Sequence, residues 1–195
     1  MIKKFIDKLL GKPAAAPKKT SPLGKRVEVT AEVHGINPDL LDERAVKVVK
    51  TLTDAGFEAY IVGGAVRDLL LNMRPKDFDV ATNATPEQVK GLFRRAFIIG
   101  RRFRIVHVVY GRGREHEVIE VSTFRAYMDN AVDTAAVQGN EKTSRSELEG
   151  KSHAVDASGR VLRDNVWGPQ IEDAARRDYT VNAMYYDPQR QLVVD

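Results

Sequence analysis

Two aspartates separated by one residue, Asp77 and Asp79, are the side chains in this sequence best suited to chemistry. They open a β-prone run, and alternate residues of a strand share a face, which would place their Cα atoms roughly 7 Å apart. Like charges this close raise each other's pKa unless a cation lies between them. Paired carboxylates suit Mg2+, which keeps several waters and binds together with substrate phosphates. The pair therefore predicts a metal site that acts on phosphates.

A glycine pair, Gly63 and Gly64, follows an apolar run and precedes a short helical pattern that carries Arg67. Glycines allow a tight turn from strand into helix, and the first N–H groups of a helix favour phosphate. The alternative is a tight turn that binds no ligand. Because the two aspartates follow in the same strand–helix–strand unit, we favour a two-metal phosphoryl or nucleotidyl transfer site.

A third acid, Glu120, stands in a second β-prone run between Ile119 and Val121. Two-metal sites usually need an acid on a neighbouring strand, so Glu120 is a candidate catalytic residue. The alternative is a strand face in contact with water. Arg125 follows the same run and is either a triphosphate ligand or an ordinary surface arginine.

Asp178 and Asn182 are four residues apart, which predicts one shared helix face with Arg177 beside them. A carboxylate and an amide suit ribose hydroxyls, and an arginine can grip phosphate with two hydrogen bonds. The alternative is a cluster of caps and salt bridges with Glu172 and Asp173. Spacing alone favours that alternative.

Three arginines surround an aromatic residue in the sequence Arg101-Arg102-Phe103-Arg104. Basic residues interleaved with an aromatic ring suit phosphate contacts and base stacking, so the arginines are candidate RNA contacts. A charged sheet edge in contact with water is the alternative.

Hydrophobic periodicity and turn residues predict the elements that must position these side chains. Helices are expected from Pro38 to about Leu52, over 63–72, from a Thr85 cap to about Ala96, and from Trp167 through Asp178. Strands are expected at 57–62, 103–110, 115–123, 192–195 and in the run that Asp77 opens. Residues 126–165 are dominated by polar types, which predicts a long flexible loop.

Composition fits a globular protein, with 43% hydrophobic and 30% charged residues in 195, and no cysteine for a disulfide or a cysteine-ligated metal. The net charge is +4, and residues 1–26 hold eight basic residues and one acid, so this segment carries +7 and the remainder −3. Residues 1–30 are therefore predicted to be a basic, disordered tail and linker, and 31–195 a folded domain. Such a tail favours polyanions without sequence selectivity. No apolar run approaches the roughly 20 residues that span a bilayer, so stable membrane insertion is not expected.

Five segments, VGGAVRDLLL, KDFDVATNATPEQV, RRFRIVHV, IEVSTFR and RRDYTVNAMYY, closely resemble the bacterial poly(A) polymerases. These are class II nucleotidyltransferases of the polymerase beta superfamily and relatives of the CCA-adding tRNA nucleotidyltransferases. The resemblance covers about residues 35–195. It implies an α+β head domain with a short mixed β-sheet flanked by helices.

The resemblance also implies a function and roles for individual residues. Asp77 and Asp79 would hold two Mg2+ ions, and Gly63, Gly64 and Arg67 would seat the triphosphate of ATP. Asp178 matches a catalytic or substrate-orienting position, Arg177 and Asn182 match nucleotide contacts, and Glu120 matches a further acid. The implied enzyme is cytoplasmic and adds AMP from ATP to RNA 3′ ends without a template, a step that promotes decay of mRNA. The neck and body domains of the family, which read the base and grip RNA, are expected beyond Asp195.

Within the family, the Arg102–Val106 segment in place of a Gly-Thr-Val-like element, and the long polar stretch before LRDNVWG, favour poly(A) addition over CCA addition. A module that binds RNA or nucleotides without catalysis is a further alternative, which the intact aspartate pair disfavours. A Rossmann dinucleotide site is excluded because Gly63-Gly64-Ala65-Val66-Arg67 lacks the Gly-x-Gly-x-x-Gly spacing.

Overall fold

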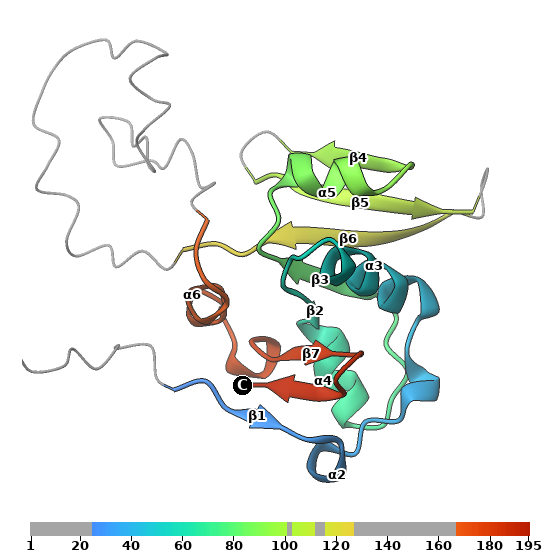
Figure 1. The fold of residues 1–195 in the computed structure, drawn as a ribbon. Helices are drawn as coiled ribbons and strands as arrows, with labels where there is room; N and C mark the ends of the chain where they lie inside the picture. The colour runs from blue at the N-terminus through green and yellow to red at the C-terminus, as the bar shows by residue number, and fades with distance from the viewer. Residues whose placement is uncertain (1–24, 101–102, 112–115, 127–166) are drawn as a thin grey trace, which may run out of the picture.

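One mixed β-sheet forms the centre of the protein (Figure 1). The computed structural model describes residues 25–100, 103–111, 116–126 and 167–195. Eight strands lie in these ranges, in the sheet order β1-β8-β7-β2-β3-β6-β5-β4. They are β1 (Glu28–Val29), β2 (Ala59–Val62), β3 (Asp79–Thr82), β4 (Ala96–Ile99), β5 (Ile105–Tyr110), β6 (Glu117–Thr123), β7 (Tyr185–Asp187) and β8 (Leu192–Val194). β3 and β6 are parallel, and the other neighbouring strands are antiparallel.

Short helices flank this sheet, which confirms the predicted α+β class. They are α2 (Ala31–His34), α3 (Glu43–Asp54), α4 (Gly64–Leu70), α5 (Pro86–Leu92) and α6 (Gln170–Ala175), with the 3-10 helices η1 (Pro38–Leu40) and η3 (Thr180–Asn182).

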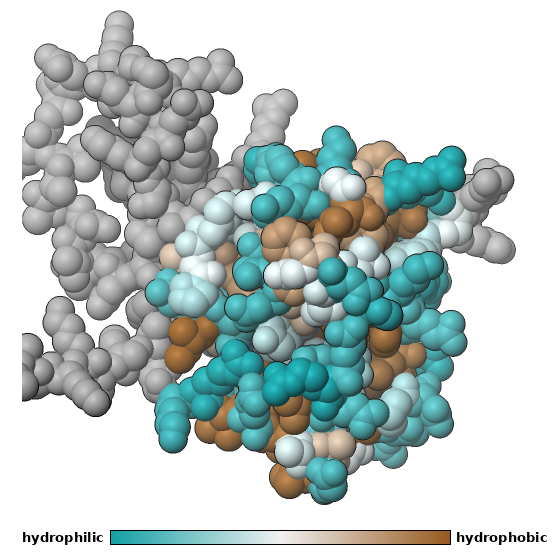
Figure 2. Space-filling view, viewed as in Figure 1, coloured by the Kyte–Doolittle hydropathy of each residue, from teal (hydrophilic) through white to brown (hydrophobic). Residues whose placement is uncertain are grey.

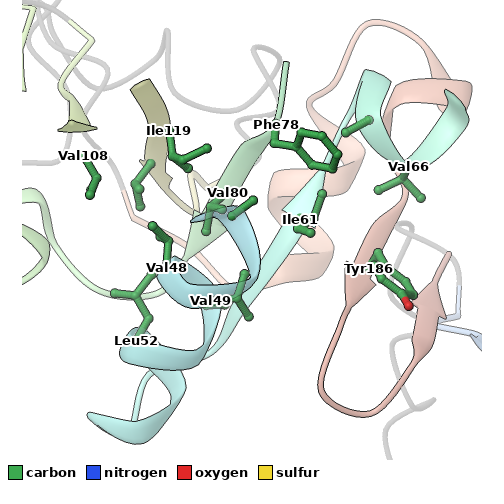
Figure 3. Packing of buried hydrophobic residues seen from close by; sticks show 14 of the residues in the cluster. Val48, Val49, Leu52, Ile61, Val66, Phe78, Val80, Val108, Ile119 and Tyr186 are labelled. Atoms are coloured by element: carbon green, nitrogen blue, oxygen red, sulfur yellow. The ribbon is translucent and has the colours of Figure 1, made fainter. Parts of the chain in front are cut away.

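The larger hydrophobic core lies between one face of the sheet and helices α3, α4 and α5 (Figure 3). Helix α3 buries Ala45, Val48, Val49 and Leu52, whose spacing places them on one helical stripe. Burying each of the larger three contributes roughly 1.5–3 kcal/mol. The predicted start of this helix at Pro38 is wrong. Pro38 begins η1, and α3 begins after Asp42, whose carboxylate accepts the Arg44 N–H at 2.8 Å.

The opposite face of the sheet is covered in part by α6. Ala174 of that helix packs against a smaller buried cluster, which comprises Tyr60, Val62, Ala81, Phe124, Tyr185 and Val194. Val62 is the antiparallel partner of Asp79, so the aspartate belongs to the same face as this cluster. Strand β3 therefore presents Asp79 on the α6 side, away from the larger core.

Several predicted boundaries differ from the structure. The Thr85 capping box is confirmed, but α5 ends at Leu92, and Ala96 begins the edge strand β4 because its partner Val108 is available for pairing. Strand β1 lies within the predicted tail 1–30, since Glu28 and Val29 pair with β8. The predicted pairing of the strands near 103–123 is confirmed as β5 with β6. The predicted flexible loop 126–165 falls outside the described residues except for its first position, as does the tail up to residue 24.

Hydrophilic side chains cover most of the molecular face seen in Figure 2, and hydrophobic side chains form separate patches between them. Phe97 and Ile99 of β4 are among the exposed hydrophobic residues, at 53% and 43% exposure. In the part of the chain that the structure describes, no helix has both the length and the apolar character needed to cross a membrane.

Candidate active site

The candidate site is built on the parallel pairing of β3 with β6, which places Asp79 directly beside Glu120. Neighbouring strands lie about 4.8 Å apart, so two carboxylates project side by side from one sheet face. The prediction of an acid on a neighbouring strand is confirmed in position. On the next strand, His107 of β5 pairs with Glu120, and its Nε2 lies 3.3 Å from Oε1 of Glu120, without hydrogen-bond geometry.

Asp77 precedes the strand rather than belonging to it. Strand β3 begins at Asp79 because its partner β2 ends at Val62, after which Gly63 turns the chain away from the sheet. Asp77 and Asp79 are both exposed while Phe78 between them is buried at 6%, so the side chains still alternate. The predicted shared face of the two aspartates agrees with this alternation, although only one of them is paired in the sheet.

The electrostatics of Asp79 are unfavourable in the protein alone. Although Asp79 reaches solvent, the protein around its carboxylate displaces part of the hydration shell and so raises its pKa. The Glu120 and Asp77 charges raise this pKa further, and the Arg177 charge opposes these effects. An added cation would relieve the repulsion among these carboxylates. Among the described residues, however, no three His, Cys, Asp or Glu side chains form a ready cluster of metal ligands. The acids here would supply only part of a cation's coordination shell.

The glycine turn lies beside this face and is shaped by its backbone angles. Gly63 has φ 73° and ψ −139°, a backbone conformation that residues with a Cβ atom rarely adopt. Arg67 folds back toward this turn, and a Cβ added at Gly64 would lie 3.4 Å from its Nη2. The Arg67 guanidinium pairs with Asp68 at 2.7 Å and donates from Nη1 to Oδ1 of Asn182 at 3.2 Å. The predicted Gly63–Gly64–Arg67 grouping is therefore brought together, and Asn182 joins it.

The predicted helix face shared by Arg177, Asp178 and Asn182 is wrong. Helix α6 ends at Ala175, and Asn182 lies in the separate 3-10 helix η3. Asp178 is exposed, and its Oδ1 accepts the N–H of Tyr179 at 3.0 Å. Arg177 nevertheless stays near Asn182, because its Nη1 reaches the backbone oxygen of Asn182 at 3.4 Å.

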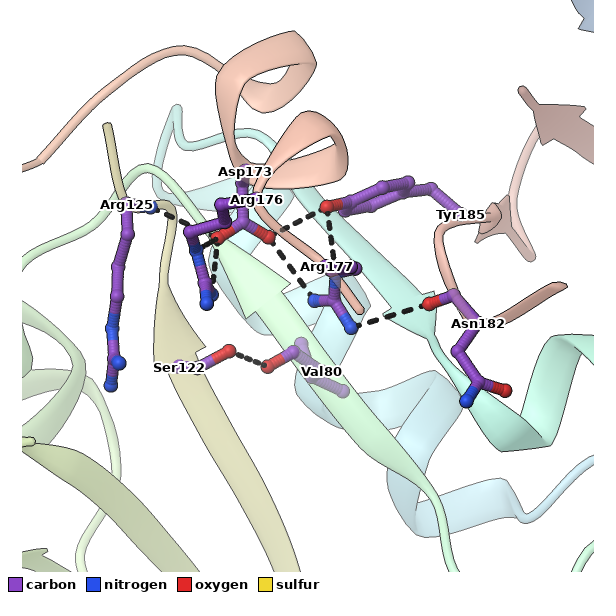
Figure 4. Close-up of polar contacts among 8 residues, drawn as sticks. All are labelled: Val80, Ser122, Arg125, Asp173, Arg176, Arg177, Asn182 and Tyr185. Atoms are coloured by element: carbon purple, nitrogen blue, oxygen red, sulfur yellow. Dashed lines mark hydrogen bonds and ion pairs between the residues drawn. The ribbon is translucent and has the colours of Figure 1, made fainter. Parts of the chain in front are cut away.

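A residue without a predicted role, Asp173, organises the arginines of the site (Figure 4). Its side chain is fully buried, and its carboxylate accepts hydrogen bonds from Arg176, Arg177 and the Tyr185 hydroxyl. It also accepts the backbone N–H of Arg125 at 3.0 Å. In the sequence, Asp173 resembled one more acid of a surface cluster. The sequence signal that could have identified this role was the spacing of Asp173, which lies three residues before Arg176 and four before Arg177.

These groups surround a cavity of about 180 Å³ on the α6 side of the sheet. Asp79 and Glu120 line it together with Arg125, Arg176 and Arg177. A pocket with two carboxylates and three guanidinium groups can receive a phosphate-rich ligand together with cations. Asp77, Asp178 and the glycine pair are not among the residues that line this cavity.

The predicted RNA-contacting arginines divide into two sets. Arg104 pairs with Glu87 of α5 at 2.5 Å, and α5 packs on the opposite face of the sheet from Asp79. Arg104 is therefore held away from the cavity, which the sequence did not reveal. Arg101 and Arg102 lie outside the described residues. Arg125 lines the cavity and also lies over the ring of Phe103, with its Cζ 5.0 Å from the ring centre.

Residues 59–195 match the family model described as the poly A polymerase head domain. The chain belongs to this poly A polymerase head-domain family. The head domain is similar to poly(A) polymerase I from Haemophilus influenzae, at 46% identity over 169 residues, which cover 86% of this chain and 33% of that protein. It is also similar to a CCA-adding enzyme from Lactobacillus helveticus, at 36% identity over 150 residues, which cover 77% of this chain and 30% of that protein.

The fold of the head domain is also found in a solved structure of a CCA-adding enzyme in an apo form. That structure has a TM-score of 0.57 and 17% identity to this chain, and the match covers 87% of this chain and 35% of that one. The predicted family resemblance and fold are thus confirmed. The chain spans about one third of the length of the curated relatives it matches.

Proposed function

We propose that this head domain carries the catalytic site of a template-independent nucleotidyltransferase that adds AMP from ATP to RNA 3′ ends. The observation that carries the proposal is the placement of Asp79 beside Glu120, facing the cavity arginines. Support for ATP and RNA as substrates comes from the similarity to proteins described as poly(A) polymerase I. The products would be an RNA longer by one adenylate and pyrophosphate.

In the proposed reaction the RNA 3′-hydroxyl attacks the α-phosphorus of ATP. A new oxygen–phosphorus bond forms as the bond from that phosphorus to the bridging oxygen breaks, and pyrophosphate leaves with the electron pair. The hydroxyl proton passes to a carboxylate of the site or to water. Arg125, Arg176 and Arg177 line the cavity and would bind and orient the triphosphate. The Gly63 turn and Arg67 would hold its outer phosphates, and Asn182 and Asp178 the ribose.

The residues present fit divalent cations such as Mg2+ as part of this site. Asp79 has its pKa raised by burial and by two neighbouring acids, a conflict that a bound cation would resolve. Asp77 and Asp79 would hold two such ions, with Glu120 nearby, and phosphates and water would complete the coordination. When bound, these ions would lower the pKa of the attacking hydroxyl and neutralise developing charge.

CCA addition to tRNA is a second candidate, favoured by the 36% identity to the Lactobacillus helveticus enzyme. The two candidates differ in base choice and in RNA. The higher identity to poly(A) polymerase I places AMP addition first.

Incubating the full-length protein with each ribonucleoside triphosphate separately, once with an unstructured RNA and once with a tRNA lacking its last three nucleotides, tests the proposal. Long tails made from ATP alone on the unstructured RNA are expected. Incorporation of CTP that is confined to the tRNA end would instead support CCA addition. A protein that binds nucleotide and RNA but incorporates nothing would be a non-catalytic binding module.

A further inference from the structure

Asp173 differs from the other acids of the site because no part of its side chain meets solvent. Burial alone would raise the pKa of Asp173, but hydrogen bonds from the Tyr185 hydroxyl and the Arg125 N–H, with the charges of Arg176 and Arg177, lower it below its usual range. The carboxylate is therefore ionised inside the protein. Buried carboxylates stay ionised only when they are paired with cations and hydrogen-bonded. Removing the charge would leave the buried donors and arginines without their partner.

The partners of Asp173 divide between its two oxygens. Oδ1 accepts Arg176 Nε at 2.8 Å and the Arg125 N–H at 3.0 Å. Oδ2 accepts the Tyr185 hydroxyl at 2.6 Å and Arg177 Nη2 at 3.1 Å. One carboxylate thus fixes a backbone group of one cavity arginine and the side chains of the other two.

Contacts with Tyr185 also hold the Arg177 side chain in place. Its Nε donates to the Tyr185 hydroxyl at 3.2 Å, and its Cζ lies 5.3 Å from the centre of the Tyr185 ring. Tyr185 is fully buried, so its ring is a rigid support for the guanidinium. Arg177 still faces the cavity, and its charge acts on Asp79.

The cavity also contains the competing partners of these arginines. Asp79 and Glu120 line the same space as Arg176 and Arg177, so a guanidinium released from Asp173 could pair with either carboxylate. Such an ion pair would occupy a carboxylate needed to bind divalent cations. It would also occupy a guanidinium group needed to bind phosphate. A buried anion behind the arginines prevents this because it holds them by charge-assisted hydrogen bonds.

We propose that Asp173 is a positioning residue that holds Arg176 and Arg177 back from Asp79 and Glu120, so that the arginines stay available for triphosphate. The inference rests on the proposed function, since it names what arranges that site. Asp173 itself would contact no substrate. It would affect the binding of triphosphate only through Arg176 and Arg177.

The test compares the affinities of the full-length protein for ATP and for adenosine, measured by calorimetry without RNA. The variant Asp173→Asn preserves shape and removes the charge. We expect the preference for ATP over adenosine to fall by about tenfold or more, since two charge-assisted hydrogen bonds are removed. Adenosine affinity should stay within about twofold of the wild type, because adenosine has no phosphate for the arginines to bind.

Asp187→Asn is the matched control. Asp187 is also a buried carboxylate, at 8% exposure, but it accepts the N–H groups of Gln189 and Arg190 in the β7–β8 turn. A general loss of stability should lower the melting temperature of both variants without changing the preference for ATP. Only the Asp173 variant should change that preference.

Tyr185→Phe provides a second test in case the Asp173 variant does not fold. It keeps the buried ring and the carboxylate but removes the hydroxyl that contacts both Asp173 and Arg177. The preference for ATP should fall by about threefold. An unchanged preference in each folded variant would overturn the role of Asp173 while leaving nucleotidyl transfer intact. A wild-type protein that binds adenosine as tightly as ATP would overturn the proposed function as well.

Discussion

Asp79 of β3 and Glu120 of β6 are partners in a parallel strand pair, and the Glu120 charge raises the pKa of Asp79. The arrangement is unfavourable for folding in isolation and suits a site that acquires cations with its substrate. Such local conflicts are typical of functional sites, where stability is lost in exchange for activity.

Neutralising Glu120 should lower the pKa of Asp79. Burial raises that pKa most, and the Glu120 charge is the next cause, so Glu120→Gln removes the larger of the two carboxylate contributions. NMR titration of the metal-free protein measures the shift directly. Glu117→Gln, on the same strand but the opposite face, should leave the Asp79 pKa unchanged. An Asp79 pKa equal to the wild-type value in the Glu120 variant would contradict this electrostatic account.

Replacing Asp79 with Asn should stabilise the metal-free protein at neutral pH. A carboxyl with a raised folded-state pKa favours folding when protonated, so its ionised form becomes costly as pH rises through that pKa. The variant should therefore melt at a higher temperature than wild type at pH 7, and the gain should shrink on acidification to pH 4. Asp54→Asn, at an exposed pair with Lys50, should change the melting temperature little. A lower melting temperature for the Asp79 variant at pH 7 would refute the prediction.

The glycine pair offers two substitutions with opposite expectations. Gly63→Ala forces a Cβ into a φ of 73° and should cost roughly 1–3 kcal/mol in the free energy of unfolding. Gly64→Ala lies in α4, where its Cβ would meet only the flexible end of Arg67 at 3.4 Å, so stability should be unchanged or slightly higher. Urea denaturation of both variants measures the difference. Equal destabilisation by the two would show that the turn conformation is not the cause.

Removing residues 1–24 should weaken RNA binding in a salt-dependent manner. This segment contains six lysines and one aspartate. For each phosphate of single-stranded RNA that the truncated protein no longer neutralises, the slope of log affinity against log salt should become shallower by about 0.7. Single-turnover AMP addition at saturating RNA should be unaffected. A truncated protein with the full salt slope would show that the segment does not bind RNA.

The elements that sequence predicted best were those defined by strict local patterns. The Thr85 capping box, the glycine turn and the acid–Phe78–acid alternation each depend on neighbouring residues, and each is present in the structure. Glu120 was also found from its strand, because apolar neighbours on both sides imply a polar residue on the other face.

The remainder of the site depends on long-range pairing that spacing cannot express. Asp178 and Asn182 are four residues apart, yet α6 ends at Ala175, so they share no helix face. Arg104 was grouped with its neighbours in sequence, yet it pairs with Glu87 of α5. Asp173 lies three and four residues before Arg176 and Arg177, but its other two partners, the Arg125 N–H and the Tyr185 hydroxyl, are 48 and 12 residues away in sequence and meet it only through the fold.

The most direct test of the account is AMP addition by full-length protein carrying Asp77→Ala or Asp79→Ala, followed with labelled ATP under single-turnover conditions. Because these carboxylates are proposed to hold the cations of the reaction, each variant should lose about a thousandfold or more of the rate. Asp54→Ala should retain the wild-type rate. Unchanged AMP addition by either site variant would contradict the central claim that this acidic face performs nucleotidyl transfer.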